Sequence, residues 1–270
     1  MRRFLKLAAG FDKIVKNMKP SYEDELKRLG KAIRILTDAA LFPKKVEVRG
    51  RENFVGEGPN LIIGNHIGSY KDVGLLFRIV PRPIFFTANK MIFTKKQFNF
   101  LVRKHLHRHL KDFGLFINLM LKPFKSLIVD YISSNIARIG TIPVDMYHSN
   151  RENIESCQRY LRAGKAVITL QGRGRVKPKE PNPYVAQFKR GASIMAHNLS
   201  REGIPVPVTP LAIFGTHIAF PVPGTIIVNV GPAMFIEDFR RGDESATIEA
   251  FRQALEARVK SLLLEILRSR

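Results

Sequence analysis

The alternation of short apolar segments with a helical pattern between residues 46 and 88 constrains the fold of this chain most strongly. Val46–Val48, Asn60–Ile63 and Pro83–Ala88 have the length and composition of buried strands. Between the last two, Ser69–Val80 has the apolar spacing of a helix. A strand, a helix and a second strand in this order form the unit of parallel sheets, so the sequence predicts an α/β fold.

The rest of the chain extends this pattern. A capping box, Ser149 to Glu152, opens a helix that Gly164 closes. With 270 residues and 45% hydrophobic content, the chain can bury a substantial core. We therefore predict one α/β domain, residues 43–270, with a mixed, mostly parallel central sheet flanked by helices. Its later strands are predicted at Ile142–Val144, Ala166–Leu170, Ile204–Phe214 and Thr225–Val230.

The final helix is predicted over Thr247–Leu267. Arg252, Arg258 and Lys260 are expected on its outer side. The apolar stripe expected to face the core consists of Ile248, Phe251, Leu255, Val259, Leu262 and Ile266.

The chain is strongly basic, with 45 Lys and Arg against 23 Asp and Glu and a formal net charge of +22. Such a positive field needs an anionic partner, which can be nucleic acid, a membrane surface or a phosphorylated ligand. No nucleic-acid recognition motif is present, Trp is absent and the aromatic residues cluster in apolar runs, so no specific nucleic acid is expected. No run of about 18 apolar residues occurs, so no transmembrane helix is expected either.

Two segments have the pattern of a membrane-docking surface. Residues 1–42 are predicted to form an amphipathic helical pair, and residues 95–137 interleave basic residues with apolar blocks such as Phe113–Met120. These blocks are too short to span a bilayer but suit one leaflet or a tunnel for a hydrocarbon chain. Packing of the first helix on its own domain, with a solvated basic face, is the alternative. His105 and His109 have the i, i+4 spacing of metal ligands, but no third ligand accompanies them, so no metal is expected.

Cys157 is the only cysteine, which excludes an internal disulfide and fits a reducing compartment. Its helical spacing with Ile154 and Leu161 predicts a core residue and not a nucleophile. A single cysteine is permitted in any compartment; with the basic charge and no spanning segment, we expect a peripheral location on the cytoplasmic face of a membrane.

The polar residues that follow the strand Asn60–Ile63 are the first candidates for chemistry. His66 stands at the carboxyl end of this strand, where open α/β sheets bind ligands. Ser69 can cap the next helix, and Asp72 lies on its first turn. An Asp within reach of an imidazole fixes its tautomer and leaves the other ring nitrogen to take a proton from a hydroxyl. His66 is thus a candidate general base oriented by Asp72; the alternative is a polar loop histidine beside a helix-stabilising charge.

A second candidate site follows the strand Ala166–Leu170. It consists of Gly172, Arg173, Gly174 and Arg175. Glycines let the backbone approach an oxyanion, while guanidinium groups bind it bidentately. A glycine-rich hairpin with solvated arginines is the alternative.

Taken in order, these segments resemble the four blocks of the glycerophospholipid acyltransferase family, which contains the lysophosphatidic acid acyltransferases. The family's first block is N-H-x4-D, its third is F-P-E-G-T-R-S followed by F-K-x-G, and its fourth is V-P-I-V-P-V-A. The resemblance covers about residues 45–235. The four similar segments here are Asn65-His66 with Asp72, Gly140–Asp145, Leu170–Arg175 with Phe188–Ala192, and Ile204–Ala212.

The resemblance implies acyl transfer from acyl-CoA or acyl-ACP, as co-substrate, to a hydroxyl of a phosphate-bearing glycerolipid such as lysophosphatidic acid, a reaction of phospholipid biosynthesis. It implies that His66 deprotonates the hydroxyl, that Asp72 holds the ring, and that no bound metal or cofactor takes part. A catalytically silent, lipid-binding relative of the family is the alternative. The residues implied to hold the acceptor phosphate are Gly172, Arg173, Arg175 and Lys189.

The sequence departs from the family pattern at four points. Five residues, not four, separate His66 from Asp72. One extra residue inside a helix would turn the carboxylate by about 100° away from the imidazole, so a loop bulge at Gly68 is expected to absorb it. Gln171 stands where the family has Glu, and Met146 where the second block ends in Arg, which leaves the acceptor's identity open. The 95–137 segment also makes the distance between the first two blocks about 30 residues longer than usual.

Overall fold

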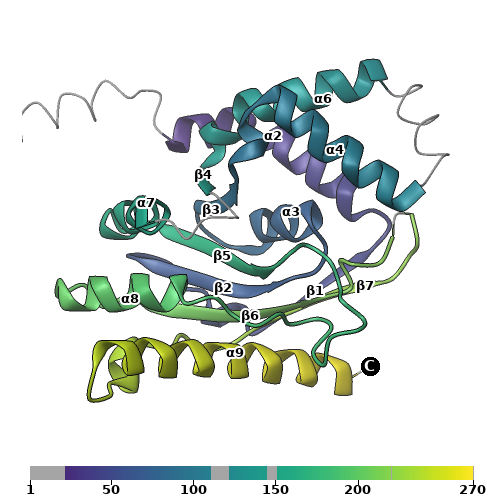
Figure 1. The fold of residues 1–270 in the computed structure, drawn as a ribbon. Helices are drawn as coiled ribbons and strands as arrows, with labels where there is room; N and C mark the ends of the chain where they lie inside the picture. Colours follow the sequence, from purple (N-terminus) through teal and green to yellow (C-terminus); the bar gives the residue numbers. More distant parts are fainter. Residues whose placement is uncertain (1–21, 111–121, 145–150, 220, 270) are drawn as a thin grey trace, which may run out of the picture.

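A seven-stranded mixed sheet forms the centre of the computed structural model, with helices on both faces (Figure 1). The structure describes residues 22–110, 122–144, 151–219 and 221–269. The strand order is β1-β7-β6-β2-β5-β3-β4, and all neighbours are parallel except β6 and β7. The predicted α/β class with a mixed, mostly parallel sheet is confirmed. The strands are β1 (Lys45–Arg49), β2 (Asn60–His66), β3 (Ile84–Asn89), β4 (Thr141–Val144), β5 (Ala166–Gly172), β6 (Val208–Phe214) and β7 (Thr225–Val230).

The helices of the described residues form separate layers on the two faces of this sheet (Figure 1). The α-helices are α2 (Tyr22–Leu41), α3 (Tyr70–Ile79), α4 (Lys95–Leu110), α6 (Lys122–Asn135), α7 (Arg151–Arg162), α8 (Gly191–Arg201) and α9 (Glu244–Arg268). Short 3-10 helices are η1 (Arg51–Asn53), η2 (Lys90–Phe93), η3 (Ile136–Ile139) and η4 (Ile236–Phe239).

Alternation along the strands divides the hydrophobic core between the two faces. Leu61 and Ile63 of β2 pack in a cluster with α7, α8 and α9, whereas Ile62 packs in a second cluster with α3 and the end of α2. Successive side chains of a strand point to opposite faces, so a continuous apolar run supplies both clusters. The central strand β2 is therefore held rigidly on both sides, up to the residue where it ends.

The layer of α2, α4 and α6 lies on the α3 side of the sheet (Figure 1). Helix α2 packs closely on α3, since a Cβ on Gly74 would lie 3.2 Å from Thr37 Oγ1. Lys95 Nζ of α4 donates to Asp130 Oδ2 of α6 at 2.5 Å. The predicted first helix and the apolar block Phe113–Met120 lie outside the described residues, and the predicted bounds 1–42 and 43–270 stay a prediction.

The predicted core stripe of α9 is confirmed, because all six of its apolar residues are buried. The prediction that Arg252 lies outside was wrong: it is 8% exposed. Its guanidinium donates to Glu249 Oε1 and to Glu256 Oε2, each at 2.7 Å. These two carboxylates on the same helix neutralise the charge, which lets the Arg252 side chain enter the protein.

Two predicted element boundaries move for identifiable reasons. Strand β6 begins at Val208 and not at Ile204, because Pro205 and Pro207 have no N–H to donate to a neighbouring strand. Helix α9 begins at Glu244 and not at Thr247, because Asp243 caps it by accepting the Ala246 N–H at 2.8 Å.

Candidate active site

The carboxyl ends of β2 and β5 meet at one edge of the sheet and bring the two predicted sites together. In the parallel pair, Asn65 is opposite Gln171 and His66 is opposite Gly172. The residue at the end of β2 is therefore the histidine, and its neighbour across the ladder is the first glycine of the arginine-bearing loop. This is the edge at which α/β sheets bind ligands.

His66 and Asp72 are in direct contact. His66 Nδ1 lies 2.8 Å from Asp72 Oδ2, and that oxygen also accepts the N–H groups of Ile67 at 2.9 Å and Gly68 at 2.7 Å. The Asp72 side chain is fully buried, whereas that of His66 is 23% exposed. Because a carboxylate only accepts hydrogen bonds, Nδ1 carries the ring proton and Nε2 presents its lone pair. The arrangement can take a proton from a hydroxyl placed at Nε2.

The extra residue between the histidine and the aspartate is accommodated in the turn before α3. Ser69 has φ 57° and ψ −128°, a conformation that side chains rarely adopt. Its hydroxyl makes no capping hydrogen bond, so the predicted cap at Ser69 was wrong. A capping residue has an extended backbone, which Ser69 does not have. The Asp72 carboxylate accepts the N–H groups of Ile67 and Gly68, which lie before the helix. The bulge thus lies at Gly68 and Ser69, and it keeps Asp72 on the His66 side.

Gly68 is required by close packing. A Cβ at this position would lie 2.3 Å from Thr216 Cβ and 2.7 Å from Asp72 Oδ1. Neither neighbour can move easily, since Thr216 and Asp72 are both 0% exposed. The turn that joins β2 to α3 therefore passes between two buried side chains, and only glycine fits there.

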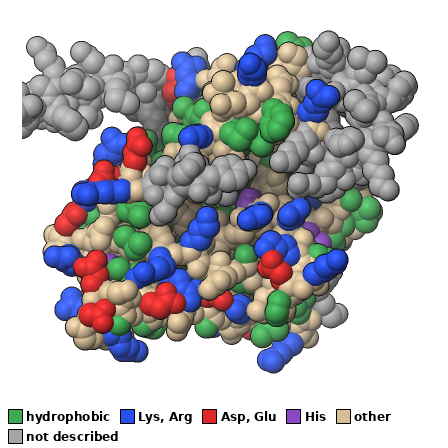
Figure 2. Space-filling view, in the orientation of Figure 1, with side chains coloured by type: hydrophobic (Ala, Val, Ile, Leu, Met, Phe, Trp, Pro, Cys, Tyr) green, Lys and Arg blue, Asp and Glu red, His purple; other side chains and the backbone are tan. Residues whose placement is uncertain are grey.

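The arginine-bearing loop passes over the imidazole. Gly174 has φ 68°, and a Cβ on it would lie 3.2 Å from His66 Nε2. Arg173 and Arg175, on either side of this glycine, are exposed, and neither forms an ion pair with another described residue. Figure 2 shows Lys and Arg side chains gathered across the middle of the face drawn, with histidines between them. An anion near the ring would thus meet uncompensated positive charge.

Gln171 and α9 position the backbone of the fourth predicted phosphate-binding residue, Lys189. Gln171 is 8% exposed, and its Oε1 accepts the Lys189 N–H at 3.1 Å. Glu256 Oε2 accepts the neighbouring N–H of Phe188 at 2.9 Å, and Arg252 holds Glu256 in place. The Lys189 side chain is exposed. Sequence reasoning missed Glu256, although an acid four residues after Arg252 on the core side of a helix was a usable signal.

Asn65 fixes the end of β2 from the other face of the sheet. Its side chain is fully buried, donates to Ile213 O at 2.9 Å and to Tyr184 O at 3.0 Å, and accepts the Ile213 N–H at 2.7 Å. These bonds tie the residue before His66 to β6 and to the loop that follows β5. Asn65 therefore positions the histidine that follows it.

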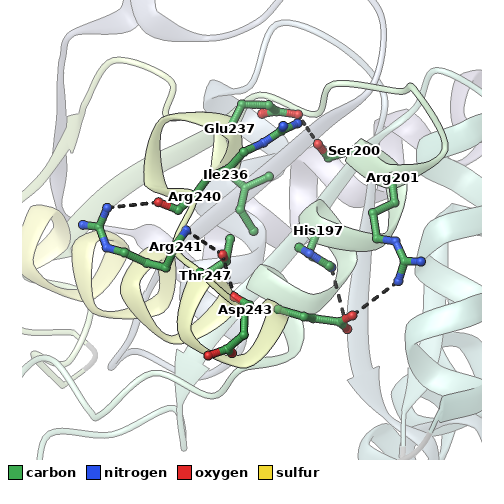
Figure 3. A pocket seen from close by; sticks show the side chains of 11 residues that line it. His197, Ser200, Arg201, Ile236, Glu237, Arg240, Arg241, Asp243 and Thr247 are labelled. Carbon is green, nitrogen blue, oxygen red and sulfur yellow. Dashed lines mark hydrogen bonds and ion pairs between the residues drawn. The ribbon is translucent and has the colours of Figure 1, made fainter.

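A separate pocket of about 360 Å³ lies near the opposite edge of the sheet (Figure 3). It lies near the amino end of β6, because η4 follows Met234, whose backbone pairs with Val208. Its polar groups largely pair with one another: Arg201 Nη1 lies 3.3 Å from Glu244 Oε2, and His197 Nδ1 lies 3.8 Å from Glu244 Oε1. Sequence reasoning did not find this pocket, and it holds none of the predicted site residues.

The remaining predictions concern the cysteine, metals and membrane spans. Cys157 is confirmed as a core residue, and burial raises the pKa of its thiol to about 12.

Among the described side chains, no group of three or more His, Cys, Asp or Glu could hold a metal ion. The side chains of His105 and His109 lie outside the described ones. No helix within the described ranges has an apolar stretch that could cross a bilayer. Asp145 and Met146 of the second block also lie outside the described residues.

The fold is that of an α/β acyltransferase. The crystal structure of the 1-acyl-sn-glycerophosphate (LPA) acyltransferase PlsC from Thermotoga maritima matches 98% of this chain and 90% of its own, with a TM-score of 0.55 and 18% sequence identity. The similarity is one of fold, and PlsC is a protein of the kind that the four sequence blocks resemble. No family model and no curated protein matches the chain.

Replacing Gly68 by alanine tests the packing of the turn. We expect Gly68→Ala to lower the free energy of unfolding by about 1–3 kcal/mol, because the added methyl overpacks Thr216 and Asp72. Gly56→Ala is the matched control, since a Cβ there meets nothing within 4 Å, and it should change the value by less than about 0.5 kcal/mol. Urea denaturation measures both. Equal stability of the two variants would contradict the packing described.

Proposed function

We propose that the protein is an O-acyltransferase that moves a fatty acyl chain from an acyl thioester, acyl-CoA or acyl-ACP, to a hydroxyl of a phosphate-bearing glycerolipid such as lysophosphatidic acid. The observation that carries the proposal is the 2.8 Å contact between His66 and Asp72 beside an exposed, arginine-bearing loop. The LPA acyltransferase PlsC, which has the same fold, supports the acceptor class.

In the proposed reaction His66 is the general base. Its Nε2 takes the proton of the acceptor hydroxyl as the oxygen attacks the thioester carbonyl. A C–O bond forms, the C–S bond breaks, and the proton passes from His66 to the departing thiolate. Asp72 keeps Nδ1 protonated and stabilises the imidazolium between these two transfers. This mechanism requires neither a metal ion nor a covalent acyl-enzyme.

The acceptor phosphate is assigned to the loop that passes over the ring. Arg173 and Arg175 can each bind phosphate oxygens bidentately, and Lys189 adds a third positive charge. The positive φ angles of Gly172 and Gly174, 129° and 68°, let the backbone lie against His66 without a side chain between them. A phosphate bound here would present the lipid's hydroxyl to Nε2.

The contact between His66 and Asp72 favours an enzyme over a catalytically silent lipid-binding relative. A silent relative would need this carboxylate only to close the turn before α3, whereas general-base catalysis also needs its contact with a partly exposed imidazole. Burying an ionised group is favourable only if it is well hydrogen-bonded. Three donors on Asp72 Oδ2 meet that condition.

Substitution of the proposed base tests the function. We expect His66→Ala to lower kcat by about 10²- to 10⁴-fold, the usual contribution of a positioned base. The assay is thiol release from acyl-CoA or acyl-ACP, with lysophosphatidic acid or glycerol 3-phosphate as acceptor. Asp72→Asn should lose most of the turnover too, because an amide cannot hold Nδ1–H in the same way.

His197→Ala is the matched control, since this histidine lies in the pocket at the other edge of the sheet. It should keep wild-type turnover. An active His66→Ala variant would contradict the base assignment, and a wild-type protein without thioester turnover would favour the silent relative.

We also propose that the layer of α2, α4 and α6 docks on an anionic membrane surface. Ile35 of α2, Phe100 of α4 and Leu127 of α6 are 68%, 56% and 68% exposed, unusually so for large apolar side chains. Exposed basic residues on the same helices include Lys31, Arg34, Lys95, Lys96 and Arg103. Each Lys or Arg near an anionic surface contributes about 1 kcal/mol, so apolar insertion and charge would act together.

The double variant Ile35→Asp/Leu127→Asp tests this docking surface. We expect it to bind vesicles of phosphatidylcholine with anionic phosphatidylglycerol at least about tenfold more weakly, because burying one such side chain contributes about 1.5–3 kcal/mol. Leu264→Asp is the control, because Leu264 is 50% exposed on α9, across the sheet (Figure 1). Vesicle sedimentation measures the binding. Equal weakening by the control, or none by the double variant, would place the membrane contact elsewhere.

A further inference from the structure

The two carboxylate oxygens of Asp72 have unequal surroundings. Oδ2 accepts three hydrogen bonds, from His66 Nδ1 and from the N–H groups of Ile67 and Gly68. Oδ1 is equally buried, but no described residue donates a hydrogen bond to it. Buried carboxylate oxygens almost always have a donor, since an unsatisfied one loses its hydration without compensation. The unoccupied Oδ1 therefore points to a missing hydrogen bond.

Thr216 has an unsatisfied hydroxyl at the same place. The residue is 0% exposed, and its Oγ1 has no hydrogen-bond partner among the described residues. A Cβ on Gly68 would lie 2.4 Å from Thr216 Oγ1 and 2.7 Å from Asp72 Oδ1. The two oxygens thus lie around the same point, where a Gly68 Cβ would be. One buried water between them can join them by hydrogen bonds.

The segment that carries Thr216 is fastened to the helix that carries Asp72. Lys71, which precedes Asp72 on α3, donates from Nζ to Ile218 O at 2.7 Å. Lys44 donates from Nζ to Ala219 O at 3.2 Å and to Val222 O at 3.0 Å. Burial, and then the charge of Lys44, lower the pKa of Lys71. The lysines hold the backbone around Thr216 in place, so its hydroxyl stays beside the carboxylate.

We propose that Thr216 is a positioning residue for acyl transfer, whose hydroxyl donates a hydrogen bond to Asp72 Oδ1, directly or through one water. This inference rests on the proposed role of His66 as general base. With both oxygens bound, the carboxylate cannot rotate, so Oδ2 stays on His66 Nδ1 and Nε2 stays directed at the acceptor. Without the hydroxyl, the carboxylate has one free oxygen and the imidazole is held less firmly, by the bonds to Oδ2 alone.

Thr216→Val tests the proposal because it removes the hydroxyl and keeps the shape. We expect kcat to fall about 10- to 100-fold, the effect of losing one hydrogen bond to a charged group, with KM changed less than about threefold. Thr216→Ser, which restores the hydroxyl, should keep kcat within about threefold of the wild type. Thr169→Val is the matched control, because Thr169 of β5 is also buried with an unpartnered Oγ1, and its turnover should not change.

Proton NMR supplies a readout that does not need turnover. The Nδ1–H of His66, hydrogen-bonded to a carboxylate, should give a signal far downfield that is absent in His66→Ala. We expect this signal to be lost or broadened in Thr216→Val and kept in Thr216→Ser and Thr169→Val. If Thr216→Val does not fold, Thr216→Ala removes the same hydroxyl without adding atoms and is measured in its place.

The outcomes separate the two proposals. An unchanged signal and unchanged kcat in the hydroxyl-free variant would overturn the role of Thr216. A signal that depends on Thr216 in a protein whose His66→Ala variant keeps its turnover would support the hydrogen bond and reject His66 as the base. An equal loss of kcat in Thr169→Val would also overturn the proposal, because it would show a general effect of buried threonines.

Discussion

A buried carboxylate holds together the strand, the turn and the helix that make up the candidate site. Asp72 accepts the N–H groups of Ile67 and Gly68 and the Nδ1–H of His66 on one oxygen. Its burial would be costly without these donors, so the turn can close only in the conformation that supplies them. The strained φ of Ser69 is the cost of that closure. The same bonds that complete the turn therefore orient the imidazole.

The sheet supplies the second half of the site. Because β2 and β5 are parallel neighbours in register, His66 and Gly172 end at the same edge, and the loop with Arg173 and Arg175 begins beside the ring. Glycines in this loop allow the close approach. The exposed guanidiniums lie on the loop that passes over the partly exposed imidazole. The proposed base and the proposed anion-binding groups are thus adjacent but follow different strands, as transfer to a phosphate-bearing alcohol requires.

The sequence predicted the fold well because strands and helices leave local patterns, and the candidate site residues were proposed from their place after two of these strands. Apolar runs located the strands, and the residues after two of them located His66, Asp72 and the arginines. Patterns failed where a particular side-chain contact, and not apolar spacing, decides the outcome. Arg252 is buried because Glu249 and Glu256 neutralise it, and Ser69 does not cap α3 because the turn that brings Asp72 to His66 gives Ser69 a positive φ. Thr216, about 150 residues from Asp72, carries no local signal at all.

A crystal structure with bound lysophosphatidic acid measures the proposed arrangement most directly. The account predicts the acceptor hydroxyl at a hydrogen-bond distance of about 2.6–3.2 Å from His66 Nε2, with the phosphate on Arg173, Arg175 or Lys189. A phosphate bound away from this loop, or a hydroxyl out of reach of Nε2 while the phosphate is in place, would contradict it.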